Sequence, residues 1–230
     1  MCDTGGVSAS SLRARVRSEM HQEIKEAARR RLATEGANLS LRAVARDMGI
    51  VASALYRYFP SRDALLTALI IDAYDALGEA AAEAEAAVPR DDLRGRWLAA
   101  CHAVRSWALA HPAEYGLLYG NPVPGYAAPP ETVVPASKVI LLLAAIAGEA
   151  PEVPAGPPLP GGVRTDLRRL IDDQGGGLSE ERLDRALLAW THLFGQVNFE
   201  VFHRLDDMVQ AREEYFGHHM ALLADLAGLP

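Results

Sequence analysis

The apolar residues of this chain recur with a helical period in almost every segment. Between residues 15 and 35, for example, Val16, Met20, Ile24 and Leu32 share one face of a helix. No segment shows the strict apolar–polar alternation of a half-buried strand, and no internal repeat is present. We therefore expect an all-α fold of about nine or ten helices.

The positions of Gly, Pro and Ser residues predict where these helices begin and end. Pro- and Gly-rich stretches at 120–131, 151–162 and 175–177 are expected to be loops. Ser40, Ser61 and Ser179 each precede a helical pattern and are good N-cap residues. After the first helix, the pattern predicts helices at 41–48, 51–59, 61–87, 93–110, 113–119, 132–148, 167–172, 179–204 and 207–226.

Charge is distributed unevenly along the chain. The formal net charge of −7 argues against nucleic acid as a partner. Residues 1–60, however, hold ten Lys or Arg and six Asp or Glu, a net of +4, so the remainder carries −11. A basic head on an acidic body indicates that one end of the molecule meets phosphates.

Cysteine content and hydropathy narrow the class of protein. Two cysteines cannot form a disulfide framework or a cysteine-rich zinc site, and they fit a reducing cytoplasm. The first fifteen residues lack the apolar core of a signal peptide. The most apolar run, 139–148, has about half the length needed to cross a bilayer. We expect a cytoplasmic protein without a membrane partner.

Residues 41–58 have the spacing of two short helices that cross at a tight turn. Gly49 supplies the positive φ for the turn, and the expected buried positions are Val44, Ala45, Met48, Ile50 and Leu55. The outward face of the second helix then carries small and polar residues, which suits entry into a major groove. Core packing is the simpler interpretation of Phe59. For Tyr56 and Tyr58, hydroxyls close to Arg57 and Arg62 favour contact with phosphates over the core.

The segments "AARRRLATEG", "LSLRAVARDMGI" and "SALYRYFPSRDALL" carry a resemblance over residues 15–69. They resemble the DNA-binding domain of the tetracycline-repressor-like (TetR) family of bacterial transcription regulators. The resemblance implies a recognition helix at 51–59 and a DNA-binding domain at 15–62, after a flexible arm at 1–14. The DNA contacts that it implies are Ser40, Arg42, Ala52, Ser53, Ala54, Tyr56, Tyr58 and Arg62.

The segments "RWLAACHAVRSWALAHPAEYGLLYG" and "WTHLFGQVNFEVF" resemble a C-terminal subclass of that family, with Trp early in the fifth helix and Gly in the middle of the eighth. The resemblance implies that residues 63–230 bind a ligand and form a homodimer through the last two long helices. The helix from Ser179 bears two apolar stripes, of which one could face a partner subunit. Its Gly195 would let another backbone come close.

The same resemblance implies a ligand cavity among helices four to eight. Its candidate lining residues are Trp97, Cys101, Val104, Trp107, Tyr115, Tyr119, Ile140, Trp190, Phe194 and Asn198. Such a lining suits a hydrophobic or aromatic small molecule. Ordinary core packing is the alternative for each of them, and the polar Asn198 and His192 could instead satisfy each other across a dimer.

The other groups of polar residues do not match a complete metal-binding or catalytic motif. Glu200-x-x-His203 is half of a di-metal motif without its second half, so we expect exposed surface there. No nucleophile elbow or phosphate loop is present. We expect no metal, cofactor or catalysis. We interpret the chain as a ligand-responsive transcription regulator, most simply a repressor that binds a palindromic operator as a dimer. The sequence does not distinguish a repressor from an activator. The alternative is a helical binding or catalytic protein that retains a helix–turn–helix.

Overall fold

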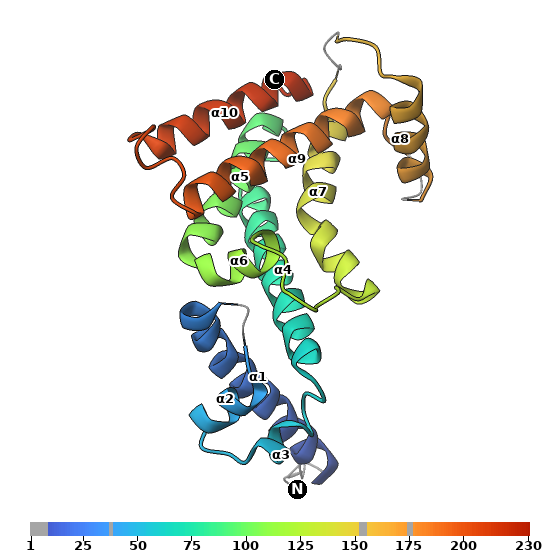
Figure 1. Ribbon diagram of the computed structural model, residues 1–230. Coiled ribbons are helices and arrows are strands. Elements are labelled where there is room, and N and C mark those ends of the chain that lie inside the picture. Colours follow the sequence, from blue (N-terminus) through green and yellow to red (C-terminus); the bar gives the residue numbers. More distant parts are fainter. Residues whose placement is uncertain (1–8, 37–38, 152–155, 174–176) are drawn as a thin grey trace, which may run out of the picture. The chain divides into compact units, whose positions relative to one another are not determined.

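The computed structural model describes residues 9–36, 39–151, 156–173 and 177–230, and this part of the chain is all-helical (Figure 1). The all-α prediction and the expected number of helices are confirmed. The elements are α1 (Ala9–Glu35), α2 (Leu41–Asp47), α3 (Ala52–Leu55), α4 (Arg62–Ala86), α5 (Leu93–Ala110), α6 (Pro112–Tyr119), the 3₁₀ turn η1 (Pro130–Thr132), α7 (Val133–Gly148), α8 (Gly161–Asp173), α9 (Glu180–Val201) and α10 (Arg212–Ala227).

Helix α3 is shorter than the sequence pattern predicts. The amides of Arg57 and Tyr58 bond to the carbonyls three residues earlier, at 3.3 and 2.9 Å, so the chain tightens after Leu55. Pro60 disfavours helical geometry at Phe59, so the helix could not continue beyond that residue. Residues 56–58 are therefore hydrogen-bonded turns, and Tyr56 is the C-cap.

Helix α8 is longer than expected. It begins at Gly161, six residues before the predicted start, and ion pairs tie it to α9: Arg164 to Glu181 at 2.9 Å and Arg168 to Glu180 at 2.7 Å. These contacts are tertiary, so local patterning does not reveal them. Residues 156–160 form no regular element, as predicted for that part of the Pro/Gly-rich loop. Residues 152–155 and 174–176 lie outside the described residues.

The chain divides into two compact units, and α4 contributes to both. The first unit comprises α1–α3, α4 up to Asp72, and residues 113–129 with α6; the second holds the rest of α4, α5 and α7–α10. In the first unit a buried cluster joins α1 to α2, α3 and the start of α4. Its members include Ile24, Ala27, Ala28, Leu39, Leu41, Val44, Ala45, Leu55, Phe59, Leu65, Leu66 and Leu69.

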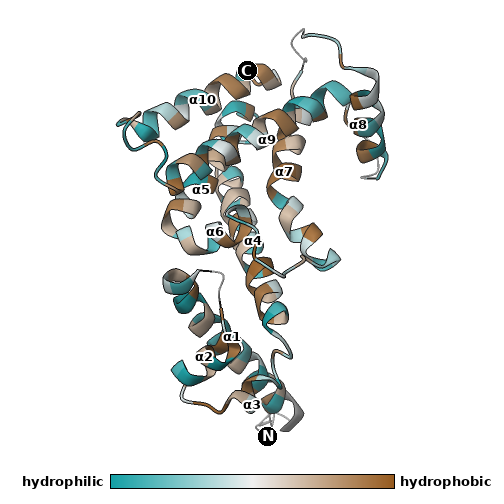
Figure 2. Ribbon diagram, viewed as in Figure 1, coloured by the Kyte–Doolittle hydropathy of each residue, from teal (hydrophilic) through white to brown (hydrophobic). Residues whose placement is uncertain are grey.

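In the second unit, α9 packs against α7, α8 and α10, and α5 packs against α10. Teal and brown residues alternate around α8 and α9, as in amphipathic helices (Figure 2). The buried indole of Trp97 donates a hydrogen bond to the Met220 carbonyl at 3.1 Å, which fixes α5 to α10. By length and composition the segment Pro130–Gly148 could span a membrane, a test that the core helix of a soluble protein also passes.

Candidate DNA-binding face and ligand site

The corner between α2 and α3 is a Schellman motif centred on Gly49. Gly49 has a φ of 68°, its amide bonds to the Arg46 carbonyl at 3.1 Å, and the Ile50 amide bonds to the Ala45 carbonyl at 3.0 Å. An added Cβ would meet no atom within 4 Å, so the positive φ and not space requires glycine here. The predicted turn residue is confirmed.

Helix α3 separates a buried anchor from an outward face. Leu55 is fully buried in the core of the first unit. Ser53 and Arg57 are exposed, and Tyr56 keeps 44% of its surface exposed. Ala52 and Ala54 are half-buried beside them, and these small side chains project little from the surface of the helix. The arrangement leaves polar groups and a cation free for a partner.

Tyr58 is held by α1, a contact that the sequence patterns did not indicate. The ring of His21 packs edge-on against the Tyr58 ring at 5.3 Å, and the Arg17 guanidinium lies 6.0 Å from the same ring. Burial, then the charges of Arg17 and Lys25, lowers the pKa of His21, so its ring is neutral at pH 7. Tyr58 is half-buried, so its exposure is intermediate between that of a core residue and that of an exposed phosphate contact. The i,i+4 spacing of positions 17 and 21 is the signal that could have found this support.

The remaining candidate contacts lie at the starts of α2 and α4. Ser40 occupies the N-cap position of α2, but its side chain makes no capping hydrogen bond. Arg42 is exposed and makes no hydrogen bond or ion pair with any residue that the structure describes. Arg62 is partly buried, and its Nε donates to the Leu39 carbonyl at 3.1 Å, so it holds the segment that leads into α2. Ser61 caps α4 as predicted, because its Oγ accepts from the Ala64 amide at 3.0 Å.

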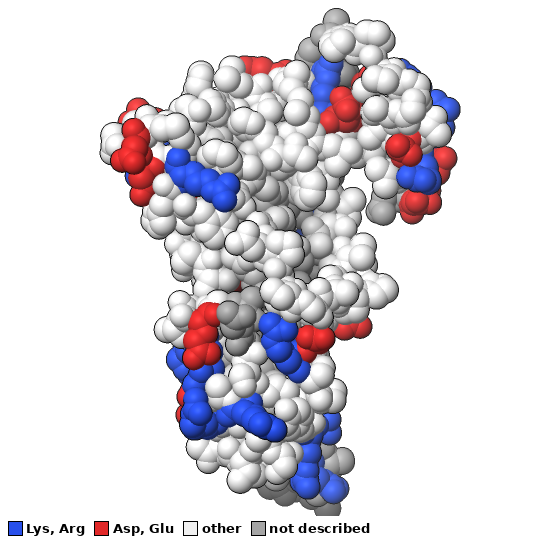
Figure 3. All heavy atoms as spheres, viewed as in Figure 1, with Lys and Arg blue, Asp and Glu red and all other residues white. Residues whose placement is uncertain are grey.

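Several cations of the basic head support the fold instead of facing outward. Lys25 and Arg29 both pair with Asp72, at 2.7 and 2.5 Å, and thereby join α1 to α4. Arg31 pairs with Asp47 and Glu35. Arg42, Arg46 and Arg57 are exposed. Figure 3 shows Lys and Arg side chains, with some Asp and Glu, on the drawn face of the part of the first unit that holds α1–α3. The basic head thus has structural and outward-facing cations, which the count of charges did not separate.

The second unit exposes an apolar face on α9 and α10. Leu188 and Leu222 are each about half exposed, at 50% and 51%. Gly195 is exposed, and an added Cβ there would meet no atom within 4 Å. Further exposed apolar residues of these helices are Phe199, Tyr215 and Leu226. The second apolar stripe expected on α9 is therefore present on its outer surface.

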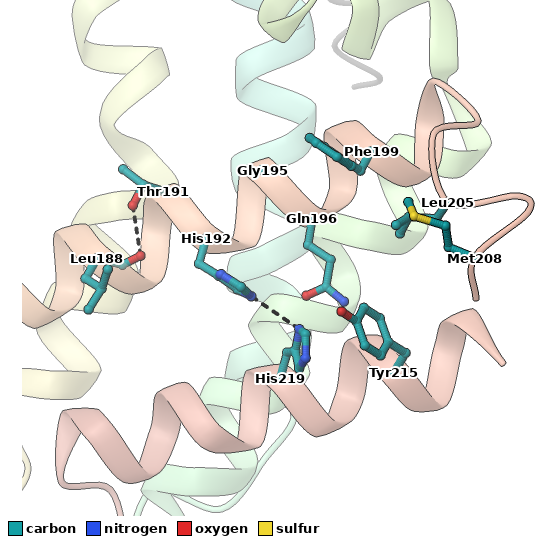
Figure 4. A pocket seen from close by; sticks show the side chains of 10 residues that line it. All are labelled: Leu188, Thr191, His192, Gly195, Gln196, Phe199, Leu205, Met208, Tyr215 and His219. Atoms are coloured by element: carbon teal, nitrogen blue, oxygen red, sulfur yellow. Dashed lines mark hydrogen bonds between the residues drawn. The ribbon is translucent and has the colours of Figure 1, made fainter. Parts of the chain in front are cut away.

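A pocket of about 450 Å³ lies on this face (Figure 4). His192 and His219 project into it from α9 and α10, with His192 Nε2 3.4 Å from His219 Nδ1. Its lining residues are Leu188, Thr191, His192, Gly195, Gln196, Phe199, Leu205, Met208, Tyr215 and His219. None of the ten residues expected to bind a ligand belongs to this lining.

The expected ligand residues are divided between the units. Tyr115 and Tyr119 belong to the first unit, where their rings lie 5.2 Å apart, and burial raises the pKa of Tyr115. The other eight belong to the second unit. Among these, Trp97, Cys101 and Val104 are buried on α5, and burial raises the pKa of the Cys101 thiol.

Of the remaining candidates of the second unit, Phe194 is buried and the others are half-buried. Trp107 is half-buried and stacks on His111 at 4.9 Å, and Ile140 and Asn198 are half-buried on α7 and α9. The rings of Trp190 and Phe194 pack edge-on at 5.8 Å. The buried Nε1 of Trp190 has no acceptor among the residues that the structure describes. Trp190 thus keeps an unused donor in an apolar setting.

Glu200 is buried, which corrects the expectation of exposed surface for the Glu200-x-x-His203 pair. It accepts two hydrogen bonds from the Arg105 guanidinium, at 2.6 and 2.8 Å, across α5 and α9. His203 is exposed and lies 3.2 Å from Asp206. The partner of Glu200 is ninety-five residues away in the chain, so local spacing could not reveal it.

Comparisons with known proteins agree with this geometry. The family model of bacterial regulatory proteins of the tetR family matches residues 24–69, and the model of the tetracyclin repressor-like C-terminal domain matches residues 97–223. Two curated relatives are the HTH-type transcriptional regulators Rv1816 of Mycobacterium tuberculosis and Mb1846 of Mycobacterium bovis. Each is 37% identical over 210 residues, which cover 88% of this chain and 88% of the relative.

Solved structures give the same result. The crystal structure of SCO4313 is 32% identical, covers 92% of this chain and 98% of its own, and has a TM-score of 0.76. The TetR family regulator PfmR of Thermus thermophilus shares the fold, with a TM-score of 0.55, 17% identity and coverage of 90% of this chain and 98% of its own. A family of transcription regulators is non-enzymatic, so the expectation that this chain is not an enzyme is confirmed. The chain belongs to the TetR family of helix–turn–helix transcriptional regulators.

Proposed function

We propose that this regulator is a cytoplasmic repressor that binds a near-palindromic operator as a homodimer and leaves it when a hydrophobic or aromatic small molecule binds. Residues 15–62 would bind DNA and residues 63–230 would bind the ligand and the second subunit. The observation that carries the proposal is the outward face of α3. Ser53, Tyr56 and Arg57 are exposed there while Leu55 anchors the helix in the core. A face of small and polar side chains can approach the base edges closely in a major groove.

The eight DNA contacts implied by the sequence remain our proposal, with different roles. Ser53, Tyr56 and Arg42 are the candidates for reading base edges. Ala52 and Ala54 offer few hydrogen bonds, so they would serve close approach and the recognition of DNA shape. Ser40, Tyr58 and Arg62 would position the unit on the phosphate backbone, with Tyr58 supported from α1 by His21.

The exposed apolar face of α9 and α10 supports a homodimer. A two-fold interface places the same patch of both subunits in contact, and the open space at Gly195 would admit a second backbone closely. Such a dimer would present two recognition helices about 34 Å apart, in successive major grooves.

Trp190 supports a small-molecule ligand in the second unit. Its buried indole N–H lacks an acceptor among the described residues and lies beside the ring of Phe194. A ligand with an apolar or aromatic body and one acceptor atom would satisfy both features. Such a ligand would shift the population of conformations towards one that does not fit the operator. Because α4 contributes to both units, it is the element through which this change would pass.

The test uses a DNA fragment from upstream of the regulator's own gene and measures binding by fluorescence anisotropy over a series of salt concentrations. Arg42→Ala should weaken binding about tenfold, because each subunit loses a cation that reads a base edge. The salt series checks that the remaining binding still depends on phosphate contacts. Arg169→Ala, which removes an exposed cation from α8 in the second unit, is the matched control. Equal affinities of the two variants, with both dimeric on sizing, would refute the assigned DNA face.

A further inference from the structure

Two imidazole nitrogens face each other across α9 and α10. His192 Nε2 and His219 Nδ1 are 3.4 Å apart (Figure 4). This separation exceeds the usual range for a nitrogen donor, about 2.7–3.2 Å. Two nitrogens bound at 2.0–2.1 Å to one tetrahedral metal ion lie roughly 3.3–3.4 Å apart. The pair therefore has the separation of two ligands of a common ion.

The surrounding side chains are arranged as two i,i+4 pairs on facing helices. His192 and Gln196 share one face of α9, and Tyr215 and His219 share one face of α10. All four project into the same pocket (Figure 4), and the rings of Tyr215 and His219 are 4.1 Å apart. Facing helices that each supply inward side chains are the usual construction of metal sites in helical bundles.

Gln196 provides independent evidence of a missing ligand. The side chain is only 9% exposed, and its Oε1 has no hydrogen-bond donor among the residues that the structure describes. A buried carbonyl oxygen without a partner destabilises a protein unless something occupies the space beside it. A metal ion or its bound water would supply that partner.

The chemistry of the pocket selects the class of ion. No carboxylate belongs to the lining, and among the described residues no group of three or more His, Cys, Asp or Glu side chains is placed so that it could hold an ion without other ligands. Calcium and magnesium require several oxygen ligands, whereas imidazole suits zinc, nickel and copper.

We propose that His192 and His219 bind one divalent transition-metal ion of the zinc, nickel or copper class, with the Gln196 carbonyl facing the same site and water completing the coordination. The ion would tie α9 to α10 on the apolar face. Both imidazoles come from one chain, so the proposal does not depend on the homodimer.

The test uses the full chain, freed of any affinity tag and stripped of metal, with Co²⁺ as a spectroscopic probe and Zn²⁺ as a competitor. The wild type should bind about one Co²⁺ per chain with the visible absorption of a low-symmetry site, and Zn²⁺ should displace it. His192→Ala and His219→Ala should each weaken binding at least about tenfold, since each removes one of two imidazole ligands. Binding should also be lost as the pH falls through the range of histidine, because protons compete with the ion.

His218→Ala is the matched control, since His218 is the exposed neighbour of His219 on α10. It should bind Co²⁺ as the wild type does. Absence of Co²⁺ and Zn²⁺ binding by the wild type, or equal binding by the wild type and His219→Ala, would overturn the proposal. Sedimentation of the same samples measures the dimer separately, so a failure of either proposal is recognised without the other. Circular dichroism of each variant without metal checks that the helices are retained.

Discussion

The two units present different side chains on the faces that we assign to partners. On and next to α2 and α3 the exposed groups include the cations Arg42 and Arg57 and the polar Ser53. Val51 and Tyr56 are exposed beside them, while the other large apolar residues lie in the core. On α9 and α10 large apolar side chains such as Leu188 and Leu222 are exposed, together with polar residues such as Glu213. Proteins bind nucleic acids mainly through charges and hydrogen bonds, whereas homodimer interfaces are formed largely by apolar contacts. The composition of an exposed face therefore separates the two kinds of partner within one chain.

The units also differ in how they bury charge. In the first unit, Asp72 is 27% exposed where it pairs with Lys25 and Arg29. In the second, the Arg96 side chain is only 1% exposed and pairs with Glu85 at 2.5 Å and with Glu149 at 2.9 Å. The energy of an ion pair depends on whether its charges can return to water when a partner is removed. Ion pairs between the same residue types should therefore contribute differently to the stability of the two units.

The largest effect is expected from Gly195→Glu. In the isolated subunit the new side chain points into open space, and replacing a glycine inside a helix favours the helix. In a two-fold dimer through α9 and α10, two carboxylates without partners would be buried, at a cost of several kcal/mol each. The dimer should therefore dissociate at concentrations at least about 100-fold higher than for the wild type, measured by analytical ultracentrifugation.

Val134→Glu is the control, because Val134 is 76% exposed on α7, away from the proposed interface. It should leave the dimer unchanged. If Gly195→Glu also remains dimeric, the apolar face of α9 and α10 does not hold the subunits together. The contrast between the two units would then have to be explained by another partner.

The second effect tests the buried ion pairs. Arg96→Ala removes the buried cation beside Glu85 and leaves that carboxylate only the exposed Arg90, at 2.9 Å. It should lower the free energy of unfolding by about 3 kcal/mol, the lower end of the range for breaking a buried pair. Asp72→Ala in the first unit removes a partly exposed group and should cost about 1 kcal/mol or less. Urea denaturation followed by circular dichroism measures both.

The double variant Arg96→Met with Glu85→Leu separates charge from packing. It removes both buried charges, while Arg90 and Glu149 can still pair with each other, as they do at 2.6 Å. Most of the loss should be recovered, since apolar residues of similar size often replace a buried pair without cost. A double variant as unstable as Arg96→Ala would show that packing and not charge determines the result.

The sequence predicted the elements of the first unit well because their signals are local. Gly49, Ser61 and the apolar spacing of α1 and α2 each act within a few residues. The end of α3 was placed too late because hydrogen bonds to residues three positions earlier continue past Leu55 without forming an α-helix. The support of Tyr58 by His21 was missed, since it joins helices far apart in the chain.

In the second unit the signals are mostly long-range, and prediction was correspondingly weaker. Apolar patterning indicated both stripes of α9 but not which face is exposed. The ion pair of Glu200 with Arg105 and the approach of His192 to His219 depend on how helices pack, which no local spacing encodes. The start of α10 was placed at 207 instead of Arg212, because residues 202–208 form turns that local spacing does not distinguish from a helix.

The smallest effect concerns that turn, where the second unit repeats the motif of Gly49 without a glycine. His203 has a φ of 60°, its amide bonds to the Glu200 carbonyl at 3.1 Å, and the Arg204 amide bonds to the Phe199 carbonyl at 2.8 Å. This is the Schellman arrangement found at Gly49, and a side chain in the left-handed region costs about 1–2 kcal/mol. His203→Gly should stabilise the protein by up to about 1 kcal/mol, less than that cost because glycine also gains freedom in the unfolded chain.

Gly49→Ala is the reciprocal change and should destabilise by about 1 kcal/mol, since it brings a Cβ to the same backbone conformation. Urea midpoints of the two variants, measured against the wild type, should therefore move in opposite directions. The exposed contact of His203 with Asp206 contributes little by comparison, because surface ion pairs are weak. A His203→Gly variant that is less stable than the wild type would mean that this contact, and not the backbone, decides which residue ends α9.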